Sequence, residues 1–250
     1  MKSRRPRGRA RATFEAKPPD DRRLTDAITV ILFDIDGTLV LTGGAGVRAM
    51  TLAFEELFAV SDAFRDVSVA GRTDSWILAG VAATHRIPPA ELARFHDVYL
   101  AHLVREIERP GPRKGVMPGV RPLLDALAVR SDAYLALLTG NYEQAARVKL
   151  EHFDLWRYFS CGAFGDDAQD RNELLPRALA RVQESGGPRV PASQVVVIGD
   201  TPHDVACAAA SGARSIAVAT GGYDVAALRS AGADVVFEDF RDLEAVLSAL

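Results

Sequence analysis

The most constraining feature of the chain is a short apolar run, Ile28 to Phe33, that ends abruptly in two aspartates, Asp34 and Asp36. Its β-branched and aromatic side chains predict a strand that is buried on both faces, as the strands of parallel sheets are. Gly37 follows at once, and its missing Cβ lets the backbone turn sharply. Because ligands of open α/β sheets bind at the carboxyl ends of strands, we expect chemistry at this junction.

After a glycine-rich connection the chain becomes helical in pattern. Apolar residues recur at helical spacing after residue 46, and Pro88 and Pro89 suit the first turn of a further helix. Pro and Gly residues between Pro110 and Gly119 close this block. We therefore predict a helical unit inserted after the first strand, with helices over 47–58, 74–84 and 88–103.

From residue 120 onward, helical and apolar β-type segments alternate, which predicts parallel strands with helices on both faces. The predicted fold class is α/β: a Rossmann-like, three-layer core with a parallel sheet, carrying an inserted α-helical cap domain. We place the core at residues 24–42 and 116–250 and the cap at 43–115. The expected strands are 134–138, 159–163, 195–198, 215–219 and 235–237, and the expected helices are 120–129, 142–151, 173–184, 205–210 and 243–250.

Residues 1–23 differ in composition from the rest of the chain. They carry nine Lys or Arg against three acidic residues, with few apolar side chains, so they cannot bury enough surface to offset the entropy of ordering. We predict a flexible basic extension, with a nucleic-acid tether or a targeting peptide as the alternative. The remainder of the chain has a net charge of −9, which disfavours a nucleic-acid partner.

The two cysteines, Cys161 and Cys207, show neither a CxxC spacing nor a nearby histidine cluster. We therefore expect two small buried side chains, no disulfide framework and a cytoplasmic location. No apolar run approaches the roughly 18 residues of a membrane span. No apolar stretch follows the basic N-terminus, as it would in a secretory signal.

Asp34 and Asp36 stand two residues apart on an extended segment, so their side chains are expected to point to the same side. Two carboxylates this close repel each other unless a cation or a proton separates them. Mg²⁺ suits such oxygen ligands and leaves room for a substrate phosphate. One carboxylate can attack phosphorus while the other protonates the leaving oxygen. An acidic turn that merely ends a strand is the alternative.

Two further strand ends carry polar side chains. Asp200 and Asp204 follow an apolar run and open a helix, although the helix dipole alone favours acidic residues there. Thr139, Gly140 and Asn141 follow another run, where a hydroxyl and an amide can bind phosphate or simply cap the next helix.

Together these motifs resemble the haloacid dehalogenase (HAD) superfamily of phosphohydrolases, and the resemblance covers the chain from about Ile28 onward. Residues 34–38 match the first motif, Asp-x-Asp-Gly-Thr, and Thr139 matches the end of the second. The fourth motif, Gly-Asp with a downstream Asp, matches Gly199, Asp200 and Asp204. The helical insertion is similar to the caps of phosphoglycolate-phosphatase-like members.

The resemblance implies a role for each matched residue. Asp34 would be the nucleophile and Asp36 the general acid and base. Mg²⁺ would be held by Asp34, by the backbone carbonyl of Asp36 and by Asp200, with Asp204 orienting the ligands. Thr139 would bind the phosphoryl group, and the substrate would also contact Gly37, Thr38, Gly140, Asn141 and, from the cap, Arg72.

One motif departs from the family pattern. The third motif of the family carries a lysine that neutralises the nucleophile and the phosphate, and residues 164–173 contain none. Arg171 is the expected substitute, because arginine is always charged and can grip phosphate with two donors. An ordinary surface arginine is the alternative at that position, and Arg177 is the next candidate for the cation.

The expected function is that of a Mg²⁺-dependent phosphatase that hydrolyses a small phosphorylated metabolite through an aspartyl-phosphate intermediate. A sugar phosphomutase also keeps both aspartates and is one alternative. A non-catalytic binding protein that retains the fold is another, and the departure at the third motif is its only support. We expect the small substrate as partner, neither nucleic acid nor membrane, and a monomer or a homodimer.

Overall fold

The computed structural model describes residues 28–250, and the predicted flexible extension, residues 1–23, lies outside the described part. The strands are β1 (Thr29–Phe33), β2 (Val40–Leu41), β3 (Gly115–Val116), β4 (Ala133–Leu138), β5 (Gly162–Ala163), β6 (Val195–Gly199), β7 (Arg214–Val218) and β8 (Val235–Phe237). The α-helices are α2 (Ala45–Phe58), α3 (Asp74–Thr84), α4 (Phe95–Glu106), α5 (Val120–Ala128), α6 (Glu143–His152), α7 (Leu174–Glu184), α8 (Pro202–Ala210), α9 (Val225–Ser230) and α10 (Leu243–Ser248). Short 3₁₀ helices are η1 (Pro89–Arg94), η2 (Trp156–Tyr158), η3 (Arg171–Glu173) and η4 (Ala192–Gln194).

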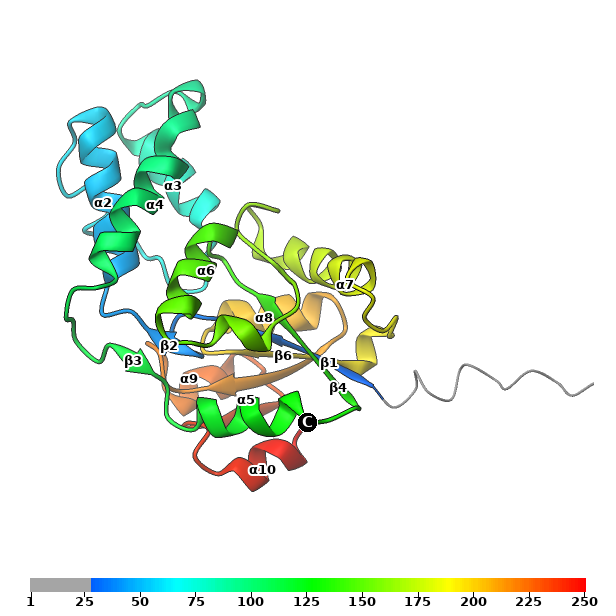
Figure 1. Ribbon diagram of the computed structural model, residues 1–250. Helices are drawn as coiled ribbons and strands as arrows, with labels where there is room; N and C mark the ends of the chain where they lie inside the picture. Colours follow the sequence, from blue (N-terminus) through cyan, green and yellow to red (C-terminus); the bar gives the residue numbers. More distant parts are fainter. Residues whose placement is uncertain (1–27) are drawn as a thin grey trace, which may run out of the picture.

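Six strands form one parallel sheet in the order β5-β4-β1-β6-β7-β8, which confirms the predicted α/β class (Figure 1). β1 lies between β4 and β6, so the chain extends the sheet first to one side of β1 and then to the other. A reversal of this kind opens a crevice at the carboxyl ends of the strands. A ligand site is therefore expected at the carboxyl ends of β4, β1 and β6.

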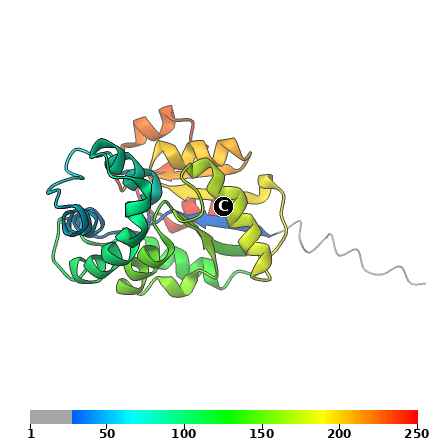
Figure 2. The same ribbon diagram turned by 90° about the horizontal axis from the view of Figure 1, so that it is seen from above.

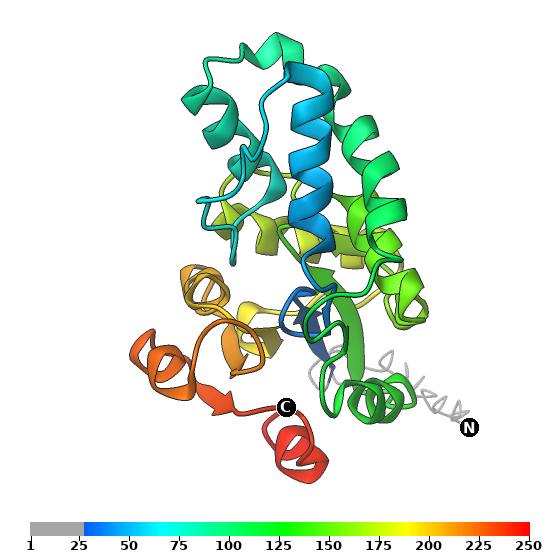
Figure 3. The ribbon, with the colours of Figure 1, turned by 90° about the vertical axis from the view of Figure 1, so that its left-hand side faces the viewer.

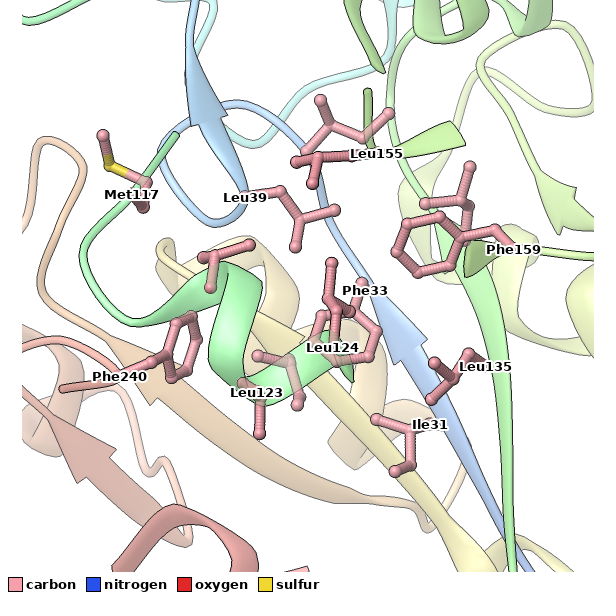
Figure 4. Packing of buried hydrophobic residues seen from close by; sticks show 14 of the residues in the cluster. Ile31, Phe33, Leu39, Met117, Leu123, Leu124, Leu135, Leu155, Phe159 and Phe240 are labelled. Atoms are coloured by element: carbon pink, nitrogen blue, oxygen red, sulfur yellow. The ribbon is translucent and has the colours of Figure 1, made fainter. Parts of the chain in front are cut away.

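Successive side chains of β1 leave the sheet on opposite faces, and both faces are covered by helices (Figure 2). Ile31 and Phe33 pack with Leu123 of α5 on one face (Figure 4). Val30 and Leu32 pack on the other face, against α7 and α8. Full burial of one such side chain contributes roughly 1.5–3 kcal/mol, so this three-layer packing fixes the position of the end of β1.

The chain between β2 and β3 forms a helical insertion beside the sheet, in which α2 and α4 pack against each other (Figure 3). Its apolar cluster includes Phe54, Phe64, Phe95 and Tyr99, whose rings contact one another. The antiparallel pair β2 and β3 joins the two ends of the insertion to the core. Between residues 28 and 250 no helix combines the length and the apolarity that spanning a bilayer requires.

Some elements differ from the sequence-based expectation. The helix predicted from Pro88 is divided into η1 and α4, since tight 3₁₀ turns are common at helix N-termini. The predicted strand 159–163 is reduced to the two residues of β5, because Phe159 ends the turn that begins at η2. We did not predict α9, a single short helix that is capped by Asp224.

Candidate active site

The carboxyl ends of three neighbouring strands meet at one edge of the sheet. Asp34 follows β1, Thr139 follows β4 and Asp200 follows β6. The backbone N–H of Asp34 donates to the carbonyl of Ile198 at 2.9 Å, so the ladder between β1 and β6 continues to the first aspartate. Parallel pairing thus brings together three polar residues that lie far apart in the sequence.

The loop after β1 is a tight turn that closes on the end of β6. The N–H of Leu39 donates to the carbonyl of Ile35 at 2.9 Å, and Gly37 has a φ of 85°, where L-residues are strained. A Cβ on Gly37 would lie 2.4 Å from Oδ2 of Asp200, so the glycine is required by both the turn and the close approach. The hydroxyl of Thr38 donates to Oδ1 of Asp200 at 3.3 Å, which links the two loops.

Arg171, the predicted substitute cation, is buried next to Asp34. Its Nη2 lies 3.0 Å from Oδ1 of Asp34 and also donates to Oδ1 of Asp204. Nη1 donates to the carbonyl of Gly71 in the insertion at 3.4 Å, and Nε is buried with no partner among residues 28–250. The structure therefore brings Arg171 to the candidate nucleophile, whereas Arg177 is exposed on α7.

Both carboxylate oxygens of Asp204 accept hydrogen bonds from other residues of the protein. Oδ1 accepts from Arg171, and Oδ2 accepts from the backbone N–H and the hydroxyl of Thr201 at 3.0 and 2.7 Å. The contacts with Thr201 form a capping box at the start of α8. Asp204 therefore anchors Arg171 and the loop after β6, and it has less capacity left for a metal than Asp34 or Asp200.

The segment after β4 contributes to the site in several ways. Thr139 is fully buried, and its hydroxyl accepts from the side-chain N–H of Asn141 at 2.8 Å. Gly140 lies against the insertion, where a Cβ would be 2.1 Å from the carbonyl oxygen of Arg72. The guanidinium of Arg72 stacks over the ring of Trp76 at 3.8 Å, so the Arg72 side chain is held on the insertion.

Lys149, on α6, is a cation of the site that we did not predict. It is 4% exposed, and its Nζ lies 2.6 Å from Oδ2 of Asp36. The family pattern predicts the cation in the segment after β5, whereas Lys149 lies before that strand, on α6. The sequence does hold a signal for it, because Lys149 shares the buried stripe of α6 with Ala145 and Ala146. A lysine on such a face is costly unless it has a partner.

Asp34, Asp200 and Asp204 form an acidic cluster, with one oxygen of each carboxylate within 4.8 Å of the others. Burial raises the pKa of Asp34 to about 6, against the opposing effect of Arg171. Burial also raises the pKa of Asp200 well above its ordinary value, and the charge of Asp34 adds to the effect. With Asp36, four carboxylates face two cationic side chains, which leaves two excess negative charges when all are ionised. This all-oxygen set fits a hard divalent cation.

A cavity of about 280 Å³ separates this edge of the sheet from the insertion. Three of the predicted site residues, Thr38, Thr139 and Asp204, lie outside its lining. The core side chains that line it carry most of the charge, and the insertion contributes mainly apolar groups. The core supplies Asp34, Asp36, Gly37, Gly140, Asn141, Lys149, Arg171 and Asp200, and the insertion supplies Val47, Met50, Val69, Arg72, Asp74, Ile77 and Tyr99 among others.

The start of α3 binds the insertion to the core. The N–H of Asp74 donates to the carbonyl of Gly140 at 2.7 Å, and Oδ2 of Asp74 accepts from the N–H of Tyr142 at 3.0 Å. The hydroxyl of Thr73 donates to the carbonyl of Gln169 at 2.8 Å. These bonds hold the insertion against the loops that follow β4 and β5, so both parts of the chain enclose the cavity.

Asp74 should make the free energy of unfolding fall as the pH rises. Burial raises the pKa of Asp74 from 3.8 to about 7, although Lys149 opposes the shift. Between these values the folded protein keeps a proton that the unfolded chain has released. Stability therefore decreases with rising pH, by at most about 1.4 kcal/mol per pH unit for one proton. We expect Asp74→Asn, which is neutral throughout, to remove this part of the slope between about pH 4 and pH 7.

Urea unfolding of the wild type and Asp74→Asn at several pH values measures the effect. Asp97→Asn is the matched control, because Asp97 is exposed on α4 and should leave the slope unchanged. An identical slope in the wild type and Asp74→Asn would mean that Asp74 is ionised in the folded protein at pH values well below 7.

The chain is similar to known proteins in sequence and in fold. The model of the haloacid dehalogenase-like hydrolase family matches residues 28–212. The chain is 34% identical over 227 residues to a phosphoglycolate phosphatase of Rhodospirillum rubrum, with 85% of this chain and 88% of that protein covered. It is 27% identical over 241 residues to a phosphoglycolate phosphatase of Escherichia coli, with 85% and 90% covered.

Solved structures share the fold. A hydrolase from Pseudomonas syringae has a TM-score of 0.67 and 24% identity, and the match covers 89% of this chain and 99% of that one. CbbY from Rhodobacter sphaeroides, solved in complex with phosphate, has a TM-score of 0.64 and 22% identity, with 86% and 96% covered. These likenesses concern the fold alone.

Proposed function

The chain belongs to the haloacid dehalogenase-like hydrolase family, and we propose that it is a Mg²⁺-dependent phosphatase acting on a small phosphorylated metabolite through a phosphoryl-Asp34 intermediate. One observation carries the proposal. Asp34 and Asp36, at the end of β1, line the same cavity as Asp200 and Arg171. A nucleophile, an acid, metal ligands and a cation for the phosphoryl group are therefore within reach of one substrate.

In the proposed reaction, an oxygen of Asp34 attacks phosphorus while the bond from phosphorus to the leaving oxygen breaks. The Asp36 carboxyl gives its proton to that oxygen, and the alcohol departs. Water then attacks the phosphorus of the acyl phosphate, its proton passes to Asp36, and Asp34 is regenerated. Arg171 offsets the negative charge of Asp34 and of the phosphoryl group.

The remaining predicted residues would hold the phosphoryl group and the rest of the substrate. Gly37 and Gly140 line the cavity and would contact the phosphoryl group. Thr38 and Thr139 would complete the phosphoryl contacts, and Asn141, whose side-chain N–H groups donate to Asp36 and Thr139, would lie beside them at the cavity. Arg72 would meet a substrate anion from the insertion.

We propose that Mg²⁺ is held by Asp34, by Asp200 and by the backbone carbonyl of Asp36, with Asp204 in support. The all-oxygen donors and their two excess negative charges favour this assignment. When bound, the ion supplies positive charge next to the carboxylates and the phosphoryl oxygens. Asp204, whose oxygens are used by Arg171 and Thr201, would act by orienting these partners.

We further propose that residues 43–115 act as a cap on a core of residues 24–42 and 116–250. The cavity of about 280 Å³ is at or below the small end of ligand pockets, which span roughly 300–1,000 Å³, so it suits a compact ester. 2-Phosphoglycolate is the first substrate to test, because relatives carry that name. The monomeric or homodimeric state and the cytoplasmic location remain predictions.

The purified protein should release inorganic phosphate from 2-phosphoglycolate, or from another small phosphate ester, only when Mg²⁺ is present. EDTA should abolish the release and excess Mg²⁺ should restore it, because the carboxylates and the phosphate repel each other without the ion. A colorimetric phosphate assay over a panel of esters measures this.

Three outcomes would contradict the proposal. Phosphate release that EDTA leaves unchanged would exclude the metal requirement. Conversion of a sugar phosphate to its isomer without phosphate release would identify a phosphomutase. Binding of phosphate esters with no turnover of any of them would favour a non-catalytic protein.

A further inference from the structure

The carboxylate of Asp36 contacts two polar side chains, those of Lys149 and Asn141. Lys149 of α6 is buried, and its Nζ contacts two acceptors, Oδ2 of Asp36 at 2.6 Å and Oδ1 of Asn141 at 2.5 Å. An ammonium group inside a protein is stabilised only by such pairing. Lys149 makes no ion pair with Asp34, whose cation is Arg171. The two cations therefore serve different aspartates.

Asn141 completes a closed network with these two residues. Its Nδ2 donates to Oδ2 of Asp36 and to the hydroxyl oxygen of Thr139, both at 2.8 Å, while its Oδ1 accepts from Lys149. A flipped amide would set its NH₂ against the ammonium and its oxygen against the carboxylate. Lys149 and Asp36 therefore fix the orientation of the amide, and the amide in turn fixes Asp36.

Both donors meet Asp36 at the same oxygen, Oδ2. Within residues 28–250, Oδ1 of Asp36 has no hydrogen-bond partner, and the side chain is 40% exposed at the cavity. With two donors on Oδ2, the other oxygen is the one that can carry or receive a proton. The geometry leaves Oδ1 as the oxygen of Asp36 that can exchange a proton with the substrate.

We propose that Lys149 and Asn141 are positioning residues for the general acid and base: they hold Oδ2 of Asp36 so that Oδ1 faces the leaving oxygen. This inference rests on the proposed phosphatase function and adds a role that Arg171 does not fill. In the first step the proton on Oδ1 passes to the leaving oxygen as its bond to phosphorus breaks. In the second step Oδ1 receives the proton of the attacking water, so one fixed oxygen serves both halves of the reaction.

The chemistry of the leaving group separates this role from a merely structural or phosphate-binding one. An alkoxide is a poor leaving group and needs a proton as the bond to phosphorus breaks, whereas 4-nitrophenolate departs without one. Loss of a cation that acts on the phosphoryl group slows hydrolysis of both esters to a similar degree. Loss of a residue that acts through Asp36 slows hydrolysis of the alkyl ester far more than that of the aryl ester. The parameter to compare is kcat/KM, because it reports the steps up to departure of the leaving group and excludes the later dephosphorylation.

We expect Lys149→Met to lower kcat/KM for an alkyl phosphate, such as 2-phosphoglycolate or glycerol phosphate, by about 100-fold at saturating Mg²⁺. For 4-nitrophenyl phosphate the loss should be only a few-fold. Lys149→Arg should recover part of the alkyl activity, because it keeps a charged donor. Lys114→Met is the matched control, since Lys114 lies outside the cavity lining and should change neither value.

Asn141→Ala is the second variant, because it removes a donor to Oδ2 without leaving a charge buried, and it should show the same selective loss. For the alkyl ester, the double variant Asp36→Asn/Lys149→Met should have a kcat/KM close to that of Asp36→Asn alone, since both changes remove the same function. Equal losses for the two esters in Lys149→Met and Asn141→Ala, or no loss for the alkyl ester, would overturn the inference. A wild type that turns over neither ester would instead refute the proposed function.

Discussion

Asp34→Asn should lower turnover by on the order of 10⁴- to 10⁶-fold and leave the fold intact, the scale seen when a hydrolase loses its nucleophile. The amide has nearly the shape of the carboxylate, but its oxygen does not attack phosphorus. Burial and the neighbouring carboxylates raise the pKa of Asp34 to about 6, so the folded protein holds this charge at a cost. A neutral side chain removes that cost, and the melting temperature should stay within a few degrees of wild type.

Turnover of 4-nitrophenyl phosphate and thermal unfolding by circular dichroism measure the two halves of this prediction. Asp132→Asn is the matched control: Asp132 lies at the opposite end of β4, is paired with Arg130 at the surface, and should have no effect on turnover. A folded Asp34→Asn protein with turnover near that of the wild type would remove Asp34 from the reaction.

Arg171→Ala should cost both activity and stability. Arg171 is buried between Asp34 and Asp204, so its removal leaves two carboxylates close together with no cation between them. Loss of such a contact to the reacting group lowers the rate about 100- to 1,000-fold. Breaking a buried ion pair from one side destabilises a fold by about 3–5 kcal/mol. Arg171→Lys should retain more of both properties, since the charge survives although the planar fork is lost.

Turnover at saturating Mg²⁺ and urea unfolding of the Arg171 variants measure these losses, at a temperature where circular dichroism shows each variant folded. Arg177→Ala is the matched control, because Arg177 is exposed on α7 and should behave as wild type. The opposite ranking, with Arg171→Ala within a few-fold of wild type and Arg177→Ala inactive, would show that Arg177 is the cation.

Much of the core could be predicted because its signals are local. An apolar run such as the one before Asp34 can be buried only in the middle of a covered sheet, and the alternation after residue 120 requires parallel strands. The same topology predicts that Asp34, Thr139 and Asp200 meet, since the ends of parallel strands share one edge. Short elements such as β2, β3 and α9 escaped prediction, because so few residues carry no clear periodicity.

The contacts that complete the site could not be predicted in this way, because they join distant segments. Lys149 meets Asp36 only when α6 and the loop after β1 come together in the folded chain, and no local pattern encodes that contact. The bond between Asp74 and Tyr142 depends on how the insertion lies on the core. The position of Arg171 followed from the family pattern, but its second bond, to Asp204, is visible only in the folded chain.

Passage of the phosphoryl group through Asp34 is tested most directly by acid quenching during turnover, followed by peptide mass spectrometry. We expect one phosphoryl group on the peptide that contains Asp34, and its loss after treatment with hydroxylamine, which cleaves acyl phosphates. The modification should be absent from Asp34→Asn and from protein quenched without substrate. Rapid turnover with no phosphoryl group on Asp34, or with the group on another residue, would contradict the proposed nucleophile.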